Sequence, residues 1–391
     1  MYRRSWLWVA ILSMTSAFLA AQDELARARR INQQAIGIDA HIDTLQRVLI
    51  EKADIGQRLT KGHVDIPRLK EGGMHAPFFA LYVPTYYKGA EAVRRTLDLC
   101  DAMQRVLDAC PQEIELATTA SDIERIVAAG KIAAFLTVEG GHQIDNDLGV
   151  LRIYYQLGIR AMTLTHFRNN DWADSSTDSP RHNGLTDFGR QVVREMNRIG
   201  MIVDVSHVSD KTFYDTLGAS TKPVIASHSA CRVLSDIPRN MTDDMLRALS
   251  KNGGVVGINF GSGFLNRKSA GALKKSISSM AAAEPDLVGK DLDKYAQDQH
   301  AKDIQGGPAE PSASIDDVVA NIDHVVKVAG IDHVGIGTDY DGVSSVPVGL
   351  EDVSHMPNLT AALLKHGYSE SDIGKILGGN FLRVIREVTG R

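Results

Sequence analysis

The chain contains 391 residues, of which 43% are hydrophobic, 23% are charged and 6% are aromatic. This composition is typical of a globular protein and excludes a disordered polymer, a collagen-like repeat and a disulfide-stapled miniprotein. The formal net charge is -5, so no excess of basic residues indicates binding to nucleic acid. The 13 histidines of this mildly acidic chain need a chemical explanation.

The first 21 residues have the pattern of a secretory signal peptide. Arg3 and Arg4 precede an almost wholly apolar run at 6–19, and Ala20 and Ala21 are small residues suited to cleavage. The run is shorter than the roughly 20 residues of a membrane span, and an uncleaved anchor is the alternative. We therefore predict a secreted or periplasmic protein, whose mature chain (22–391) forms one domain without a membrane anchor.

Short apolar segments rich in β-forming residues punctuate the chain. Their near-continuous apolarity is typical of parallel strands that are covered on both faces. They occupy residues 36–43, 77–84, 132–139, 159–166, 201–207, 223–229, 255–260 and 333–339. Helical patterns separate most of them, and this alternation predicts an α/β fold, specifically a (β/α)₈ TIM barrel.

The expected helices include 92–109, 121–129, 148–157, 184–200, 242–250 and 315–329. Two further helical stretches, 360–365 and 369–388, follow the eighth strand and should pack outside the barrel. Residues 266–314 are polar and irregular. We interpret them as an insertion after the seventh strand, partly helical and partly loop, of the kind that often elaborates a surface or covers a site.

Ionisable side chains gather at or near the ends of the predicted strands. His41 and Asp43 end the first strand, and they point the same way because residues i and i+2 of a strand share a face. Other predicted strands end at or contain Glu139, His166, His207, His228 and Asp339. Because the carboxyl ends of barrel strands form one rim, we expect these side chains to converge there.

Imidazoles and carboxylates that converge without thiolates favour Zn²⁺ or a related divalent ion. His41, Asp43, Glu139, His207 and His228 supply three nitrogens and two carboxylates. That set exceeds the three protein ligands of a typical catalytic zinc. It suits two metal ions that share one carboxylate and bind a bridging hydroxide. The alternative is a group of hydrogen-bonded core histidines.

The stretches around these residues form a family pattern. They include IDAHID (38–43), VEGGHQIDNDLGVLR (138–152), RAMTLTHFRNNDWADSS (160–176), VDVSHVS (203–209), ASHSACR (226–232) and HVGIGTDYDG (333–342). In these motifs, and in their order along nearly the whole mature chain, the sequence resembles the zinc dipeptidases of the renal (membrane) dipeptidase type, within the amidohydrolase superfamily. Agreement over so many motifs is far more specific than any one of them.

The resemblance implies a role for each rim residue. His41 and Asp43 match the ligands of the first metal ion, and Glu139 matches the carboxylate that bridges both ions. His207 and His228 match the ligands of the second ion. The implied cofactor is therefore two Zn²⁺ per chain.

Three further residues match groups that handle the substrate. His166 matches the histidine that contacts the substrate carbonyl oxygen, where it can stabilise developing negative charge. Arg239 matches the arginine that binds the terminal carboxylate, for which a guanidinium fork is well suited. Asp339 matches the acid/base aspartate, which can pass a proton to the leaving amine.

We therefore predict a zinc-dependent dipeptidase that hydrolyses the peptide bond of dipeptides, L–D dipeptides included, by a metal-bridged hydroxide. The alternatives are another binuclear amidohydrolase acting on N-acyl amino acids, and a non-catalytic metal-bound binding protein. Relatives are often homodimers, so the resemblance also implies a homodimer, although no segment of the sequence indicates an interface.

The chain departs from the family pattern in two places. Phe167 and Arg168 follow His166 where mammalian relatives have a cysteine, so the family disulfide at that position is not expected. The segment 266–314 has no clear counterpart in the compact relatives, and substrate preference is therefore not carried over in detail.

Overall fold

The computed structural model describes residues 23–279, 287–304 and 312–390. The predicted signal peptide lies outside the described residues, as do two stretches of the predicted insertion, 280–286 and 305–311. In the described part of the chain, no helix combines the length and apolarity needed to cross a membrane.

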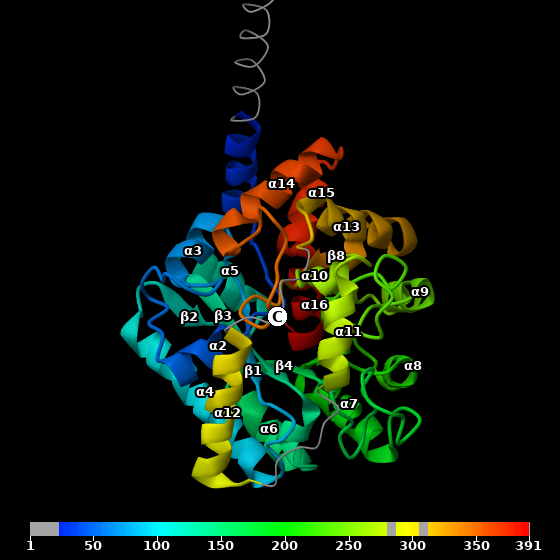
Figure 1. Ribbon diagram of the computed structural model, residues 1–391. Coiled ribbons are helices and arrows are strands. Elements are labelled where there is room, and N and C mark those ends of the chain that lie inside the picture. The colour runs from blue at the N-terminus through cyan, green and yellow to red at the C-terminus, as the bar shows by residue number, and fades with distance from the viewer. Residues whose placement is uncertain (1–22, 280–286, 305–311, 391) are drawn as a thin grey trace, which may run out of the picture.

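Parallel strands curl into a TIM-barrel-like sheet at the centre of the molecule (Figure 1). Neighbours in the sheet follow the chain order, as is usual when each parallel strand is joined to the next by a crossover. The strands are β1 (Phe78–Tyr82), β3 (Ile132–Glu139), β4 (Ile159–Thr163), β5 (Ile202–Asp204), β6 (Ile225–Ser229), β7 (Val255–Ile258) and β8 (Val334–Ile336). A short strand that the sequence analysis missed, β2 (Ile114–Leu116), pairs with the beginning of β3.

The predicted first strand, 36–43, does not form a regular strand but only isolated bridges, which corrects the sequence-based expectation. Asp39 makes an isolated parallel bridge to Ile336 of β8, and Ile42 makes one to Phe79 of β1. The Ile42 N–H donates to the Phe78 carbonyl at 3.0 Å. The segment thus divides its backbone hydrogen bonds between the two ends of the sheet, which joins them but interrupts a continuous ladder.

Helices surround the sheet in Figure 1. They are α2 (Thr44–Gln46), α3 (Ile66–Gly72), α4 (Ala90–Ala109), α5 (Ala120–Ala128), α6 (Leu148–Gln156), α7 (Asp187–Ile199), α8 (Asp210–Ala219), α9 (Asp243–Lys251) and α13 (Ile315–Ala329). Helix α7 illustrates how local residues determine where a helix begins and ends. The Thr186 side chain accepts a hydrogen bond from the Gly189 N–H at the start, and Gly200 ends the helix with a left-handed φ of 84°.

The C-terminal helices are α14 (Met356–Lys365), α15 (Glu370–Gly374) and α16 (Asn380–Thr389). Phe381, Val384 and Ile385 of α16 are buried in one cluster with residues from the amino-terminal ends of the strands, among them Phe78 and Ile225. This helix therefore covers the end of the barrel opposite the predicted site, which leaves the carboxyl rim for chemistry.

The predicted insertion contains α11 (Ala270–Ser279) and α12 (Gly289–Ile304), and it follows a short helix, α10 (Ser262–Leu265). Helix α12 packs beside the β1–α4 connection: Tyr87 donates from its hydroxyl to Asp293 at 2.9 Å, and the Tyr86 and Tyr295 rings lie 5.1 Å apart. Figure 1 shows α12 on the α2 and α4 side, while α11 lies on the α9 side. The two helices of the insertion therefore lie on two sides of the barrel.

Candidate active site

The strands bring the predicted site residues to one end of the barrel. Glu139 is the last residue of β3, and His228 lies within β6. His166, His207 and Asp339 follow the ends of β4, β5 and β8 in the chain. His41 and Asp43 belong to the segment 36–43, which joins the two ends of the sheet. Six of these seven residues are buried and Asp339 is partly buried, so the rim positions form a shielded cluster.

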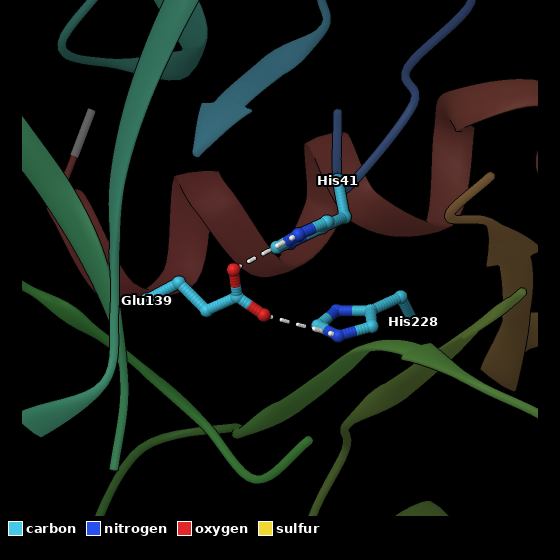
Figure 2. Close-up of side chains that lie close together, drawn as sticks. All are labelled: His41, Glu139 and His228. Carbon is cyan, nitrogen blue, oxygen red and sulfur yellow. Dashed lines mark ion pairs between the residues drawn. The ribbon is translucent and has the colours of Figure 1, made fainter. Parts of the chain in front are cut away.

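Glu139 lies at the centre of this cluster. Its Oε2 is 3.5 Å from His41 Nε2, and its Oε1 is 3.4 Å from His228 Nε2, so the carboxylate faces both imidazoles (Figure 2). The same Oε1 is 3.1 Å from His207 Nε2 and 3.6 Å from His166 Nε2. One carboxylate thus reaches four histidines contributed by different parts of the barrel.

Two further carboxylates, Asp43 and Asp339, lie on the His41 side of the cluster. Asp43 Oδ2 is 3.4 Å from His41 Nε2, and His41, Asp43 and Asp339 bring ligand atoms within 4.8 Å of one another. The absence of a side chain at Gly342 permits this arrangement, because a Cβ there would overlap both Asp43 Oδ2 and Asp339 Oδ1.

The residues fit the divalent metal ions that the sequence implies. Three groups with ligand atoms within 4.8 Å of one another are His41–Glu139–His228, Glu139–His166–His207 and His41–Asp43–Asp339. Among the described residues, buried His41 Nε2 and Asp43 Oδ1 have no hydrogen-bond partner. Burying several carboxylates without compensation is costly, and a cation would remove that cost.

The electrostatic environment shifts the pKa values of the histidines in opposite directions. Burial opposes protonation of His41, but the charges of Glu139 and Asp43 prevail and raise its pKa well above the usual value. Burial, together with the positive charge of Arg239, lowers the pKa of His207, and burial likewise lowers that of His228. The last two imidazoles are therefore neutral near pH 7, which is the form that binds metal.

Asp339 is held in a strained and desolvated position. Burial raises its pKa to about 7, and the nearby Asp43 carboxylate contributes to the rise. Its backbone has a φ of 61°, which is uncommon for a residue other than glycine and typical of functional sites. Asn259, just after β7, donates from Nδ2 to Asp339 Oδ2 at 2.8 Å. Asn259 was not predicted from the sequence, because a single asparagine after an apolar strand belongs to no motif.

Arg239 lies beside the cluster and is buried. Its Nη2 donates to the His228 carbonyl at 3.3 Å, while Nε and Nη1 have no partner among the described residues. Burial lowers its pKa to about 10, so the guanidinium stays charged at neutral pH. The Phe264 ring of α10 lies 5.4 Å from its central carbon. A buried guanidinium with unused donors is suited to an anionic group that enters the site.

A barrel with imidazoles and carboxylates converging at its carboxyl rim defines a metal-dependent hydrolase site. A family model described as membrane dipeptidase (peptidase family M19) matches residues 25–390. The chain belongs to this family and is a metallo-dipeptidase, a hydrolase acting on peptide bonds.

Individual relatives agree with the family match. Dipeptidase tcpJ of Claviceps purpurea is 39% identical over 337 residues, which span 84% of this chain and 69% of that protein. Dipeptidase 3 of Rattus norvegicus is 36% identical over 376 residues, spanning 92% of this chain and 68% of that protein.

Solved structures also share the fold. The probable dipeptidase PvdM from Pseudomonas aeruginosa has a TM-score of 0.79 at 26% identity, covering 94% of this chain and 99% of its own. A metallopeptidase from Rhodobacter sphaeroides, liganded with a phosphinate mimic of the dipeptide L-Ala-D-Ala, has a TM-score of 0.75 at 26% identity, covering 91% and 100%.

Proposed function

We propose that this dipeptidase uses two zinc ions held by His41, Asp43, Glu139, His207 and His228. The observation that carries the proposal is the position of Glu139, whose two oxygens face His41 Nε2 on one side and His207 and His228 Nε2 on the other. A carboxylate so placed can join two ion sites. When bound, such ions activate water and polarise a carbonyl group.

Arg239 would orient the substrate. Its Nε and Nη1, which have no partner among the described residues, can donate hydrogen bonds to the terminal carboxylate of a dipeptide. Because Arg239 also bonds the carbonyl of His228, it fixes the distance between the bound carboxylate and the cluster. This arrangement favours short substrates with a free C-terminus.

His166 and Asp339 would act on the reacting groups. His166 lies 3.6 Å from Glu139 at the edge of the cluster, where an imidazole N–H can stabilise negative charge on the substrate carbonyl oxygen. Asp339, with a pKa of about 7, can hold a proton from the attacking water and deliver it to the leaving amine.

The proposed substrates are dipeptides, including those with a C-terminal D-residue. The Rhodobacter sphaeroides relative was solved with a mimic of L-Ala-D-Ala, which supports L–D dipeptides as a class to test. We further propose that the mature chain is secreted or periplasmic, on the basis of the apolar segment at 6–19 and its flanking residues. A single domain over 22–391 and a homodimer remain predictions.

The test is a panel of L–L, L–D and N-acylated substrates, assayed with the full mature chain before and after chelation and after zinc is restored. We expect hydrolysis of free dipeptides that is lost on chelation and recovered with zinc. Faster turnover of N-acyl amino acids would favour the other amidohydrolase function. Absence of chelator-sensitive hydrolysis across the whole panel would contradict the proposal and favour a binding protein.

A further inference from the structure

A buried hydrogen-bond chain lies beneath His228. Ser227 Oγ is 2.8 Å from His228 Nδ1 and donates its own proton to Asp204 Oδ2 at 2.6 Å. All three side chains are 2% exposed or less. Asp204 is the last residue of β5, and Ser227 and His228 are consecutive in β6. Neither Asp204 nor Ser227 is among the site residues predicted from the sequence.

The other partners of Asp204 determine which atoms donate and which accept in this chain of hydrogen bonds. Its Oδ1 accepts from the backbone N–H groups of Ser206 and Ser227 at 3.0 and 2.9 Å, and its Oδ2 also accepts from Thr163 Oγ1 at 2.6 Å. A carboxylate only accepts hydrogen bonds. The Ser227 hydroxyl proton therefore points to Asp204, and the Ser227 oxygen is left to accept from a proton on His228 Nδ1.

This direction determines the tautomer of His228. With its proton on Nδ1, the neutral ring carries its lone pair on Nε2, the atom that faces Glu139 Oε1 at 3.4 Å. His41 and His207 differ, because their Nδ1 atoms have no hydrogen-bond partner among the described residues. Among the described residues, the hydrogen bond at Nδ1 therefore distinguishes His228 from His41 and His207.

We propose that Asp204 and Ser227 are positioning residues that hold the Nε2 lone pair of His228 toward the metal site. The inference rests on the proposed zinc function. Hydrogen bonds to the remote nitrogen of a metal-binding histidine fix its tautomer and orientation, and their loss typically lowers metal affinity about 10- to 100-fold.

The chain offers a closely matched pair of variants. Ser227→Ala and Thr163→Val each remove one hydroxyl that donates to Asp204 Oδ2 at 2.6 Å, but only Ser227 also contacts His228. A merely structural need for donors to Asp204 would make the two variants equivalent. The positioning role makes them different, and Ser227→Thr, which retains the hydroxyl, should restore the wild-type behaviour.

Asp204→Asn provides a second test. The two backbone N–H groups at Oδ1 cannot reverse, so the amide oxygen of asparagine would stay there and its NH₂ would face the hydroxyls of Ser227 and Thr163. The Ser227 hydroxyl would then accept from asparagine and turn its proton toward His228 Nδ1. This reversal favours the tautomer protonated on Nε2, which has no lone pair for the metal.

The experiment measures zinc binding to the full mature chain by competition with a chromophoric chelator. We expect Ser227→Ala to lower the affinity for one of the two zinc ions about 10- to 100-fold. Asp204→Asn should lower this affinity at least as much. Thr163→Val and Ser227→Thr should bind zinc like the wild type. Wild-type binding by Ser227→Ala, or equal losses in Ser227→Ala and Thr163→Val, would overturn the inference.

A second readout does not depend on metal. In metal-free protein with ¹⁵N-labelled histidine, NMR should show the proton of His228 on Nδ1 in the wild type and on Nε2 in Asp204→Asn. An Nε2 proton in the wild type would overturn the positioning role. A wild type that binds no zinc but shows the Nδ1 proton would contradict the zinc proposal and leave the hydrogen-bond chain established.

Discussion

Asn259 donates a hydrogen bond from Nδ2 to Oδ2 of Asp339 at 2.8 Å, while its own Oδ1 accepts from the Gly261 N–H at 2.6 Å. The asparagine is fully buried. It therefore joins the end of β7 to the proposed acid/base residue after β8. This contact favours the ionised carboxylate of Asp339, against the burial that raises its pKa to about 7.

Removing this hydrogen bond should shift the pH dependence of hydrolysis. Without the Asn259 donor, the pKa of Asp339 rises further, so the carboxylate needed to take up a proton is lost at a higher pH as the solution is acidified. The acidic limb of the kcat/KM profile should move upward in Asn259→Ala. It should move further in Asn259→Asp, which adds a like charge. An unchanged limb in both variants would contradict this role of Asn259.

Arg239→Ala should separate substrates by their C-terminus. Losing a charge-assisted contact to a carboxylate costs about 1.5–3 kcal/mol, or roughly 10- to 100-fold in kcat/KM, for dipeptides with a free C-terminus. C-terminally amidated dipeptides should change little, since they lack that carboxylate. Steady-state kinetics on matched pairs checks this, and equal losses on both would reject the carboxylate contact.

Gly342→Ala should displace the carboxylates while every proposed metal ligand keeps its identity. The added methyl would overlap Asp43 Oδ2 and Asp339 Oδ1, so we expect zinc binding and turnover to fall together. Gly218→Ala in α8 is the matched control, because no atom outside its own helix segment and neighbours lies within 4 Å of the added Cβ. The control should keep full activity and gain about 0.5–1 kcal/mol of stability. Full zinc affinity in Gly342→Ala would contradict the expected clash.

Helix α12 should depend on Asp293 for its place beside the barrel. Asp293 accepts from Tyr87 at 2.9 Å and pairs with Arg94 at 2.8 Å. Asp293→Ala should increase hydrogen exchange within α12 while the rest of the chain keeps its protection, because these contacts are at the surface of the fold. Asp298 is an exposed aspartate on the same helix, and Asp298→Ala should leave hydrogen exchange within α12 unchanged. Equal exchange in the two variants would show that Asp293 does not hold α12.

Much of the fold could be predicted because the strands are short apolar runs separated by amphipathic helices. The structure confirms the parallel barrel-like arrangement and the order of its strands. The segment 36–43 has the same apolar pattern, yet forms only bridges, since its neighbours lie at the two ends of the sheet and no local pattern records that division. Strand β2 was missed because Ile114–Leu116 is too short to show a period.

The convergence of the site could also be predicted, because Glu139, His207 and His228 lie at strand ends that meet at one rim. Their supporting contacts could not. Asn259 reaches Asp339 from 80 positions away in the sequence, and Asp204 binds Ser227 from 23 positions away. Such contacts depend on the barrel bringing neighbouring strands together, and the motif that contains Asp204 does not show which side chain this aspartate contacts.

The most direct test of the central claim is native mass spectrometry of the purified mature chain, titrated with zinc after chelation. We expect saturation at two zinc ions per chain, since Glu139 faces ligand groups on both sides. Saturation at one ion, or no zinc binding at all, would contradict the proposal that Glu139 joins two metal sites.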